Sequence, residues 1–101
     1  MMARLHRMEV ASPWFEHLRD GSKVVEGRKC TPRWAIINAN DRIMIVKRDA
    51  PEESFLFVVE DIKAYPDIRS YLEGEAIYLQ WSTSEEVEEY GFLAFVGHVQ
   101  V

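Results

Sequence analysis

The pattern of apolar and polar positions divides the chain into short strands and helices. Within residues 42–47, Ile43 and Ile45 point to one face while Met44 and Val46 point to the other. A strand that is apolar on both faces is typical of the centre of a sheet. Further strands are predicted where apolar residues gather between turn signals, at Leu5–Val10, Lys23–Lys29, Phe55–Lys63 and Phe92–Val101.

Two residues mark the beginning of a first helix, and a glycine marks its end. Ser12 is suited to the N-cap and Pro13 to the first helical position. Trp14 and Leu18 lie four residues apart and so share a face, with Phe15 beside them. Gly21 follows where a left-handed residue commonly ends a helix. The segment is therefore expected to pack its aromatic face against the sheet.

Polar segments predict the connections. Pro32 disfavours helix at Thr31, so residues 31–33 are expected to form a turn or loop. Residues 38–41, Asn-Ala-Asn-Asp, predict a tight turn, because Asn and Asp tolerate left-handed backbone and form side-chain turns. Residues 48–54 are expected to form a polar, hairpin-like loop. Two further short helices are expected, one after Pro66 and one in the acidic stretch capped by Ser84.

This order of elements predicts the fold class. Strands dominate, and the helices fall between them, which suits an α+β fold: a small mixed β-barrel of about five or six strands with two or three short helices. At 101 residues the chain is expected to form one domain, 1–101, with one modest core. The hydrophobic fraction of 48% agrees with a folded globular protein.

The composition of the chain indicates in which cellular compartment the protein is expected. The sequence contains no apolar run of about 18 residues, so no membrane partner is expected. Charges interrupt the apolar residues at the N-terminus, which is atypical of a secretory signal. The single Cys30 excludes an intramolecular disulfide. A reducing intracellular location fits these features; we expect the cytoplasm, with the nucleus left open.

Charge is distributed unevenly along the chain. Residues 1–48 carry a net charge of +5 and residues 49–101 carry −10. A bipolar chain can present a local basic surface to nucleic acid although its net charge is −5. The alternative is that the two halves attract each other within the fold. The acidic run at residues 85–89 is a solvated helix face or a docking surface for a basic protein partner.

The segment at residues 21–29 carries the densest charge pattern. Its two valines and its inner glycine are interleaved with Lys23, Glu26, Arg28 and Lys29. Alternation along a strand places Glu26 and Arg28 on one face, where the carboxylate can orient the guanidinium and leave donors for a phosphate or a base edge. The alternative is a purely structural ion pair. The direction of the Lys23 side chain is open, because the chain is still turning there.

Other candidate chemistry is sparse. His6, His17 and His98 lack ligand spacing, so neither a metal site nor a cofactor is expected. Trp34 and Trp81 lie at loop edges beside polar residues and can offer stacking platforms for bases. Trp14 is better explained as part of the core.

Together these features resemble the ASCH domain family. The shared pattern is an aromatic-rich helix, then Gly-x-Lys-x-x-Glu-x-Arg, then a Gly-Asp turn into an apolar strand. Here the motif residues are Gly21, Lys23, Glu26 and Arg28, and residues 40–41, Asn-Asp, replace Gly-Asp. The resemblance implies a PUA-like barrel with a cleft facing RNA or a nucleotide-like molecule. We expect the ligand-contacting residues to be Lys23, Glu26, Arg28, Lys29, Arg33, Trp34 and Arg42.

One branch of that family suggests an alternative activity. It removes the acetyl group from acetylated cytidine with a Lys, a Thr three residues later and a helix Glu. Lys23 matches the lysine, but Glu26 stands at the threonine position, so the catalytic set is broken. A nucleophilic lysine must be a neutral amine, and a neighbouring carboxylate favours the ammonium form. Lys23 and Glu26 are thus catalytic candidates only if the protein is such an amidohydrolase.

Overall fold

The computed structural model describes residues 3–66 and 91–100, and these form five strands and two short helices. In chain order they are β1 (Leu5–Val10), α1 (Trp14–Asp20), β2 (Val25–Lys29), α2 (Pro32–Ala35), β3 (Arg42–Lys47), β4 (Ala50–Tyr65) and β5 (Phe92–Val99). The helices expected after Pro66 and in the acidic stretch capped by Ser84 lie outside the described residues. Neither described helix is long and apolar enough to span a membrane.

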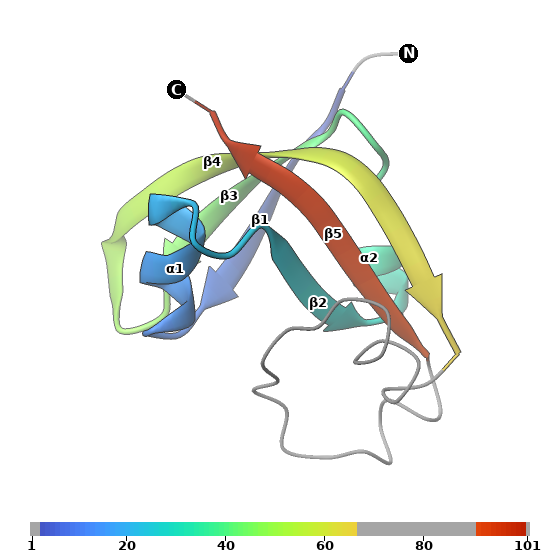
Figure 1. Cartoon of the computed structure of the whole chain (residues 1–101), viewed down its shortest axis with the longest axis horizontal. Helices are drawn as coiled ribbons and strands as arrows, with labels where there is room; N and C mark the ends of the chain where they lie inside the picture. Colours follow the sequence, from blue (N-terminus) through green and yellow to red (C-terminus); the bar gives the residue numbers. More distant parts are fainter. Residues whose placement is uncertain (1–2, 67–90, 101) are drawn as a thin grey trace.

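All five strands belong to one strongly curved mixed sheet (Figure 1). Their order is β1-β3-β4-β5-β2, so β1 and β2 are its two edges. β1 runs parallel to β3, and the other pairs are antiparallel. The central position predicted for residues 42–47 is confirmed, because β3 lies between β1 and β4.

β4 is longer than expected. The strand already begins at Ala50, which pairs with Lys47, so a two-residue turn replaces the loop predicted over residues 48–54. The polar side chains that suggested a loop belong to the solvated end of a hairpin. β4 then continues past a bulge between Val59 and Asp61 and pairs with β5 along its second half. One strand thereby joins the two halves of the sheet.

α1 forms where it was predicted, with a different start. The helix begins at Trp14 and Pro13 occupies the N-cap, so the assignment of Ser12 as N-cap was wrong. The Ser12 hydroxyl instead donates to Glu16 Oε2 at 3.0 Å. Gly21 ends the helix at φ 85°, the left-handed conformation expected of it.

The expected loop at residues 31–33 is also wrong, because residues 32–35 form the helical turn α2. Pro32 takes the first position, where its missing N–H costs nothing. Thr31 before it is extended, with ψ 162°, as the proline requires. This turn carries Arg33 and Trp34, and it places the Trp34 ring beside Arg28 of β2.

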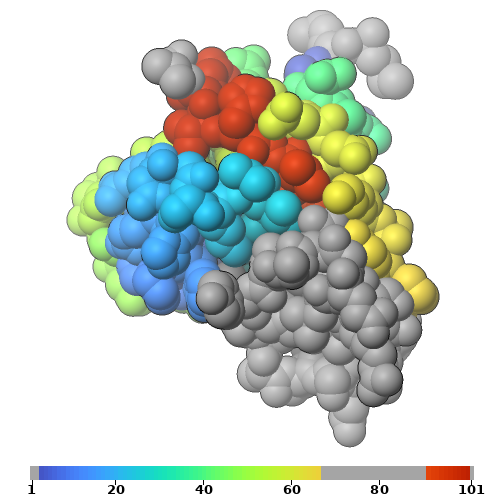
Figure 2. Space-filling model, in the orientation of Figure 1, coloured from blue at the N-terminus to red at the C-terminus, as the bar shows by residue number. Residues whose placement is uncertain are grey.

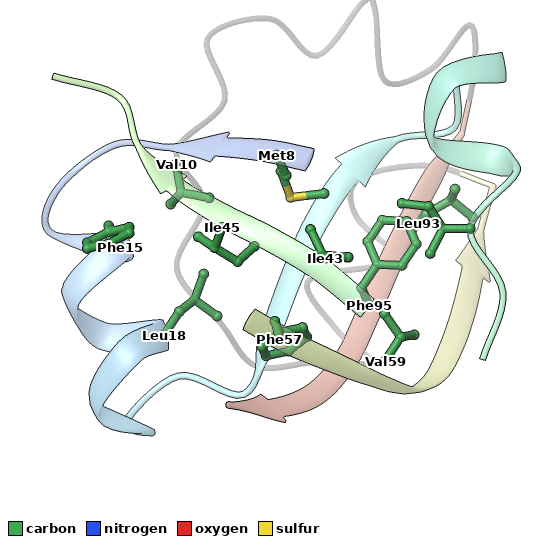
Figure 3. Close-up of a cluster of buried hydrophobic side chains, with 11 residues drawn as sticks. Met8, Val10, Phe15, Leu18, Ile43, Ile45, Phe57, Val59, Leu93 and Phe95 are labelled. Carbon is green, nitrogen blue, oxygen red and sulfur yellow. The ribbon is translucent and has the colours of Figure 1, made fainter. Parts of the chain in front are cut away.

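The core lies on one face of the curved sheet and under α1 (Figure 3). α1 contributes Phe15 and Leu18, and Trp14 is only half-buried against them. The strands contribute the remaining large side chains, so the core joins β1, β3, β4 and β5. Its members are Met8, Val10, Phe15, Leu18, Ile37, Ile43, Ile45, Phe57, Val59, Leu93 and Phe95.

Charged side chains fasten α1 to the β3–β4 hairpin. Lys47 Nζ lies 3.1 Å from Glu16 Oε2 and 3.4 Å from Glu53 Oε2, and Arg19 Nη1 lies 3.2 Å from Glu53 Oε1. The hydrogen bond to Glu16 is the main reason that the pKa of Lys47 is raised. Two of these contacts join the basic first half to the acidic second half, so part of the charge asymmetry is neutralised inside the fold.

The turn predicted at residues 38–41 is present, with Asn40 at φ 74°. Its last residue, Asp41, is buried and accepts hydrogen bonds from the backbone N–H groups of Arg4 and Asn38 and from the His6 ring. Burial alone raises the pKa of Asp41, but these hydrogen bonds outweigh it and lower the pKa to about 2. Asp41 therefore ties the start of β1 to the start of β3.

Replacing Asp41 by Asn is expected to lower the free energy of unfolding at neutral pH by about 2–3 kcal/mol. The pKa falls from 3.8 to about 2, so the charged form is stabilised in the folded state. This contribution is complete above about pH 5 and is lost as pH falls through about 2. Urea unfolding of both proteins between those limits should show the difference shrink towards low pH; a constant difference would contradict the assignment.

Candidate ligand-binding site

Glu26 lies on the same face of the sheet as the core. β2 pairs with β5 in antiparallel register, and Glu26 stands opposite Phe95. Directly opposed residues project to the same face, and Phe95 is a core residue. Glu26 is 1% exposed, which makes it one of two buried acidic side chains among the described residues. A buried carboxylate requires partners.

Lys23 is the first partner of Glu26. Its Nζ donates to Glu26 Oε1 at 2.6 Å, and its side chain is only 9% exposed. The regular alternation of a strand does not apply, because β2 starts two residues later at Val25. The backbone N–H of Lys23 donates to the carbonyl of His17, which fixes this corner against the end of α1. The structure thus settles the direction that the sequence left open.

Arg28 is the second partner, as the strand pattern predicted. Its Nη2 donates to Glu26 Oε2 at 2.9 Å and also to the backbone carbonyl of Glu9 at 2.7 Å. Its Nε is buried and has no hydrogen-bond partner within the described part of the chain. One N–H of the guanidinium is therefore buried without a hydrogen bond to the described residues.

Two cations share one carboxylate, so the set carries a net charge of +1. Both Glu26 oxygens are occupied, and none of the three side chains is more than 15% exposed. Buried ions of this kind cost several kcal/mol of desolvation each, and a hydrophobic replacement is often as stable. A contribution to stability is thus a weak explanation for these three buried charges. Binding a ligand is a better explanation, because the two fixed cations can donate hydrogen bonds to an acceptor group of that ligand.

Trp34 extends the set towards the surface. The Arg28 guanidinium carbon lies 5.5 Å from the centre of the Trp34 ring, and that of Arg33 lies 4.6 Å from it. Both distances are within the range of cation–π contacts. Arg33 is exposed and Trp34 is half-buried. The candidate site therefore has a buried part, formed by Lys23, Glu26 and Arg28, and an exposed part, in which Arg33 lies over the Trp34 ring.

Two predicted site residues lie elsewhere. Lys29 projects to the opposite face of β2 from Glu26, opposite Phe92 on β5. Arg42 pairs with Leu5 on β1, four residues or about 13 Å from the carbonyl of Glu9. Its Nη1 lies 3.5 Å from Gln100 Oε1. The structure therefore brings together Lys23, Glu26, Arg28, Arg33 and Trp34 and places the other two outside this group.

Sequence reasoning missed two supporting features. The carbonyl of Glu9 is a backbone group, 19 residues from Arg28 in sequence, and no side-chain pattern marks it. The corner before Lys23 is held by Ser22, whose hydroxyl donates to Asp20 Oδ1 at 2.6 Å. The Asp-Gly-Ser run at residues 20–22 is a turn signal that could have revealed this. In Figure 2 the segment from α1 to β2, blue to cyan, packs against β5 in red.

Metal ligands do not gather in residues 3–66 and 91–100: no three His, Cys, Asp or Glu side chains are placed to hold an ion. Trp81 and the acidic run at residues 85–89 lie outside the described residues.

Comparison with known proteins identifies the family. The ASCH domain model matches residues 8–96, and no curated protein matches the chain significantly. Several solved structures have similar folds. The hypothetical protein PH0355 is 18% identical over 96% of this chain and 99% of its own, with a TM-score of 0.71.

Two further structures agree. The ASCH protein from Zymomonas mobilis is 18% identical over 93% of this chain and 66% of its own, with a TM-score of 0.67. PF0455 from Pyrococcus furiosus is 18% identical over 94% of this chain and 96% of its own, with a TM-score of 0.63. These likenesses confirm the predicted α+β, PUA-like fold. Since the family model covers most of the chain, the protein belongs to the ASCH domain family.

Proposed function

We propose that this domain binds RNA or a nucleotide-like molecule through Lys23, Glu26 and Arg28, flanked by Trp34 and Arg33. The observation that carries the proposal is the Arg28 guanidinium, which Glu26 holds at 2.9 Å beside the half-buried Trp34 ring and the exposed Arg33. A hydrogen bond from a charged donor contributes about 1.5–3 kcal/mol, so a guanidinium fixed beside an aromatic ring suits a base carbonyl or a phosphate oxygen.

The surrounding groups suit such a ligand. Lys23 and Arg28 carry only donors, so the group that meets them is an acceptor, such as a base carbonyl or a phosphate oxygen. Glu26 holds both cations in place before binding, which reduces the entropy that binding must overcome. The Trp34 ring and the exposed Arg33 lie next to this point and supply a stacking surface and a phosphate contact.

The geometry supports binding over hydrolysis of acetylated cytidine. Lys23 Nζ already donates to Glu26 Oε1 at 2.6 Å, so the side chain is engaged in a buried ion pair and is not free to attack a carbonyl. Glu26 occupies the threonine position of the hydrolytic branch and is already bonded through both oxygens. Docking of a basic protein on residues 85–89 is a separate proposal, for which a pull-down with those glutamates changed to glutamine is the test.

Removing Arg33 is expected to weaken binding of uridine 5′-monophosphate and of a short single-stranded RNA about 3- to 10-fold. The Arg33→Ala variant loses one phosphate contact and one cation–π contact, together about 1 kcal/mol at an exposed site. Calorimetric titration at two salt concentrations measures the change, and the RNA should also show a smaller salt dependence in the variant.

The matched control is Arg48→Ala, which removes an exposed arginine with the same charge change at the β3–β4 turn. Arg48→Ala should leave both affinities within about 1.5-fold. Equal losses in the two variants would show non-specific attraction by net charge. Failure of the unmodified protein to bind either probe at low salt would reject the proposed function.

A further inference from the structure

The curved sheet has a seam between its two edges. β1 and β2 stand at opposite ends of the strand order, so no strand ladder joins them in the way that β3 joins β4. Figure 1 shows these two edge strands approaching each other beneath the arch of β4 and β5. A hydrogen bond connects the two strands, because Arg28 on β2 donates to the carbonyl of Glu9 on β1 at 2.7 Å.

One guanidinium nitrogen makes this bridge. Arg28 Nη2 uses one hydrogen for Glu26 on its own strand and the other for Glu9 across the seam. Glu26 is fixed in turn by Lys23, which comes from the corner after α1. The bridge is therefore anchored firmly on the β2 side and ends in a single hydrogen bond on the β1 side. That single bond is the weak point of the connection.

We propose that Arg28 is a latch across the β1–β2 seam and that ligand binding tightens it. The coupling part of this inference rests on the proposed function. The same guanidinium carries both the bond to Glu9 and the contact with the Trp34 ring, beside which the proposed ligand binds. An acceptor bound at the exposed part of the Arg28 side chain, 15% of its surface, fixes the plane of the guanidinium, and the bond to Glu9 is then formed more of the time. By linkage, a closed seam favours the ligand by the same factor.

Hydrogen exchange of the ligand-free protein tests the latch. Arg28→Met removes every donor and leaves Glu26 paired with Lys23. Amides of β1 and β2 should then exchange about 10-fold faster or more, the factor expected for a lost charge-assisted hydrogen bond. Amides of Ile45 and Phe57, in the central strands, report global unfolding and serve as the reference. Arg28→Lys should show a smaller increase than Arg28→Met.

The matched control is Arg7→Met on β1, since Arg7 pairs with Glu9 through an exposed side-chain contact at 3.2 Å. It should leave exchange of both edge strands unchanged. If Arg28→Met raises exchange equally in all strands, or not at all, Arg28 is not a latch. If Arg7→Met reproduces the effect of Arg28→Met, the latch is likewise overturned.

The coupling is tested by adding saturating uridine 5′-monophosphate to the unmodified protein. Exchange of the β1 and β2 amides should slow several-fold relative to the central strands. Saturable binding without this slowing overturns the coupling and leaves the proposed function intact. Absence of binding overturns the proposed function together with the coupling, while the ligand-free experiment still decides whether Arg28 closes the seam.

Discussion

Replacing Glu26 by glutamine is expected to lower the free energy of unfolding by about 3–5 kcal/mol, the usual cost of breaking a buried ion pair by removing one partner. Lys23 and Arg28 would remain close together, 9% and 15% exposed, with no carboxylate between them. Glutamine keeps the shape of the side chain, so packing is preserved and the effect is electrostatic. Urea unfolding, monitored by tryptophan fluorescence, measures the change.

Glu9→Gln is the matched control. Glu9 also accepts from an arginine side chain, but that pair is about half exposed, so the same substitution should cost less than about 1 kcal/mol. Adding Lys23→Met to the Glu26→Gln variant should restore part of the stability, because it removes one of the two repelling charges. A cost for Glu26→Gln as small as that of Glu9→Gln would show that the carboxylate is not needed to hold the cations.

Replacing Gly97 by alanine is expected to cost about 3 kcal/mol or more, at the upper end for overpacking in a core. A Cβ at this position would overlap the carbonyl oxygen of Val58 and lie 2.7 Å from Phe57 Cε2. Because the obstacle includes backbone of the paired strand β4, rotation of a side chain cannot relieve it. The predicted result is separation of β4 from β5 beside the bulge, or failure to fold.

Gly21→Ala provides the comparison, since it adds the same methyl group where nothing lies within 4 Å. Its cost should be about 1–2 kcal/mol and arise from the left-handed backbone at φ +85° alone. Thermal unfolding of both variants would contradict this account if Gly21→Ala proved the more damaging change.

Much of the fold follows from local patterns. The alternation around Ile43 and Ile45 predicts a central strand with one face in the core, and the positions of Phe15 and Gly21 predict where α1 packs and ends. The start of β4 at Ala50 and the turn α2 were missed, because polar residues and proline indicate a loop equally well. Contacts made in the folded protein decide whether such a segment is a loop or a regular element. For β4 the deciding contact is the pairing of Ala50 with Lys47 on β3.

Only part of the candidate site could likewise be predicted from the sequence. The pairing of Glu26 with Arg28 follows from the two-residue period of a strand, so the sequence predicts it. The direction of Lys23 does not follow, because it depends on how the chain leaves α1. The role of Glu9 is beyond any sequence pattern, since the group involved is a backbone carbonyl on an edge strand brought close only by the curvature of the sheet.

The measurement that most directly tests whether the buried cations serve a ligand is the NMR resonance of the Arg28 side-chain Nε–H during titration with uridine 5′-monophosphate. The resonances of Arg7 and Arg48, which are exposed, provide internal references. We expect a saturable shift of the Arg28 signal, with the same midpoint as calorimetric binding and little change at the other two. Binding that leaves the Arg28 signal unmoved, or moves all three together, would contradict it.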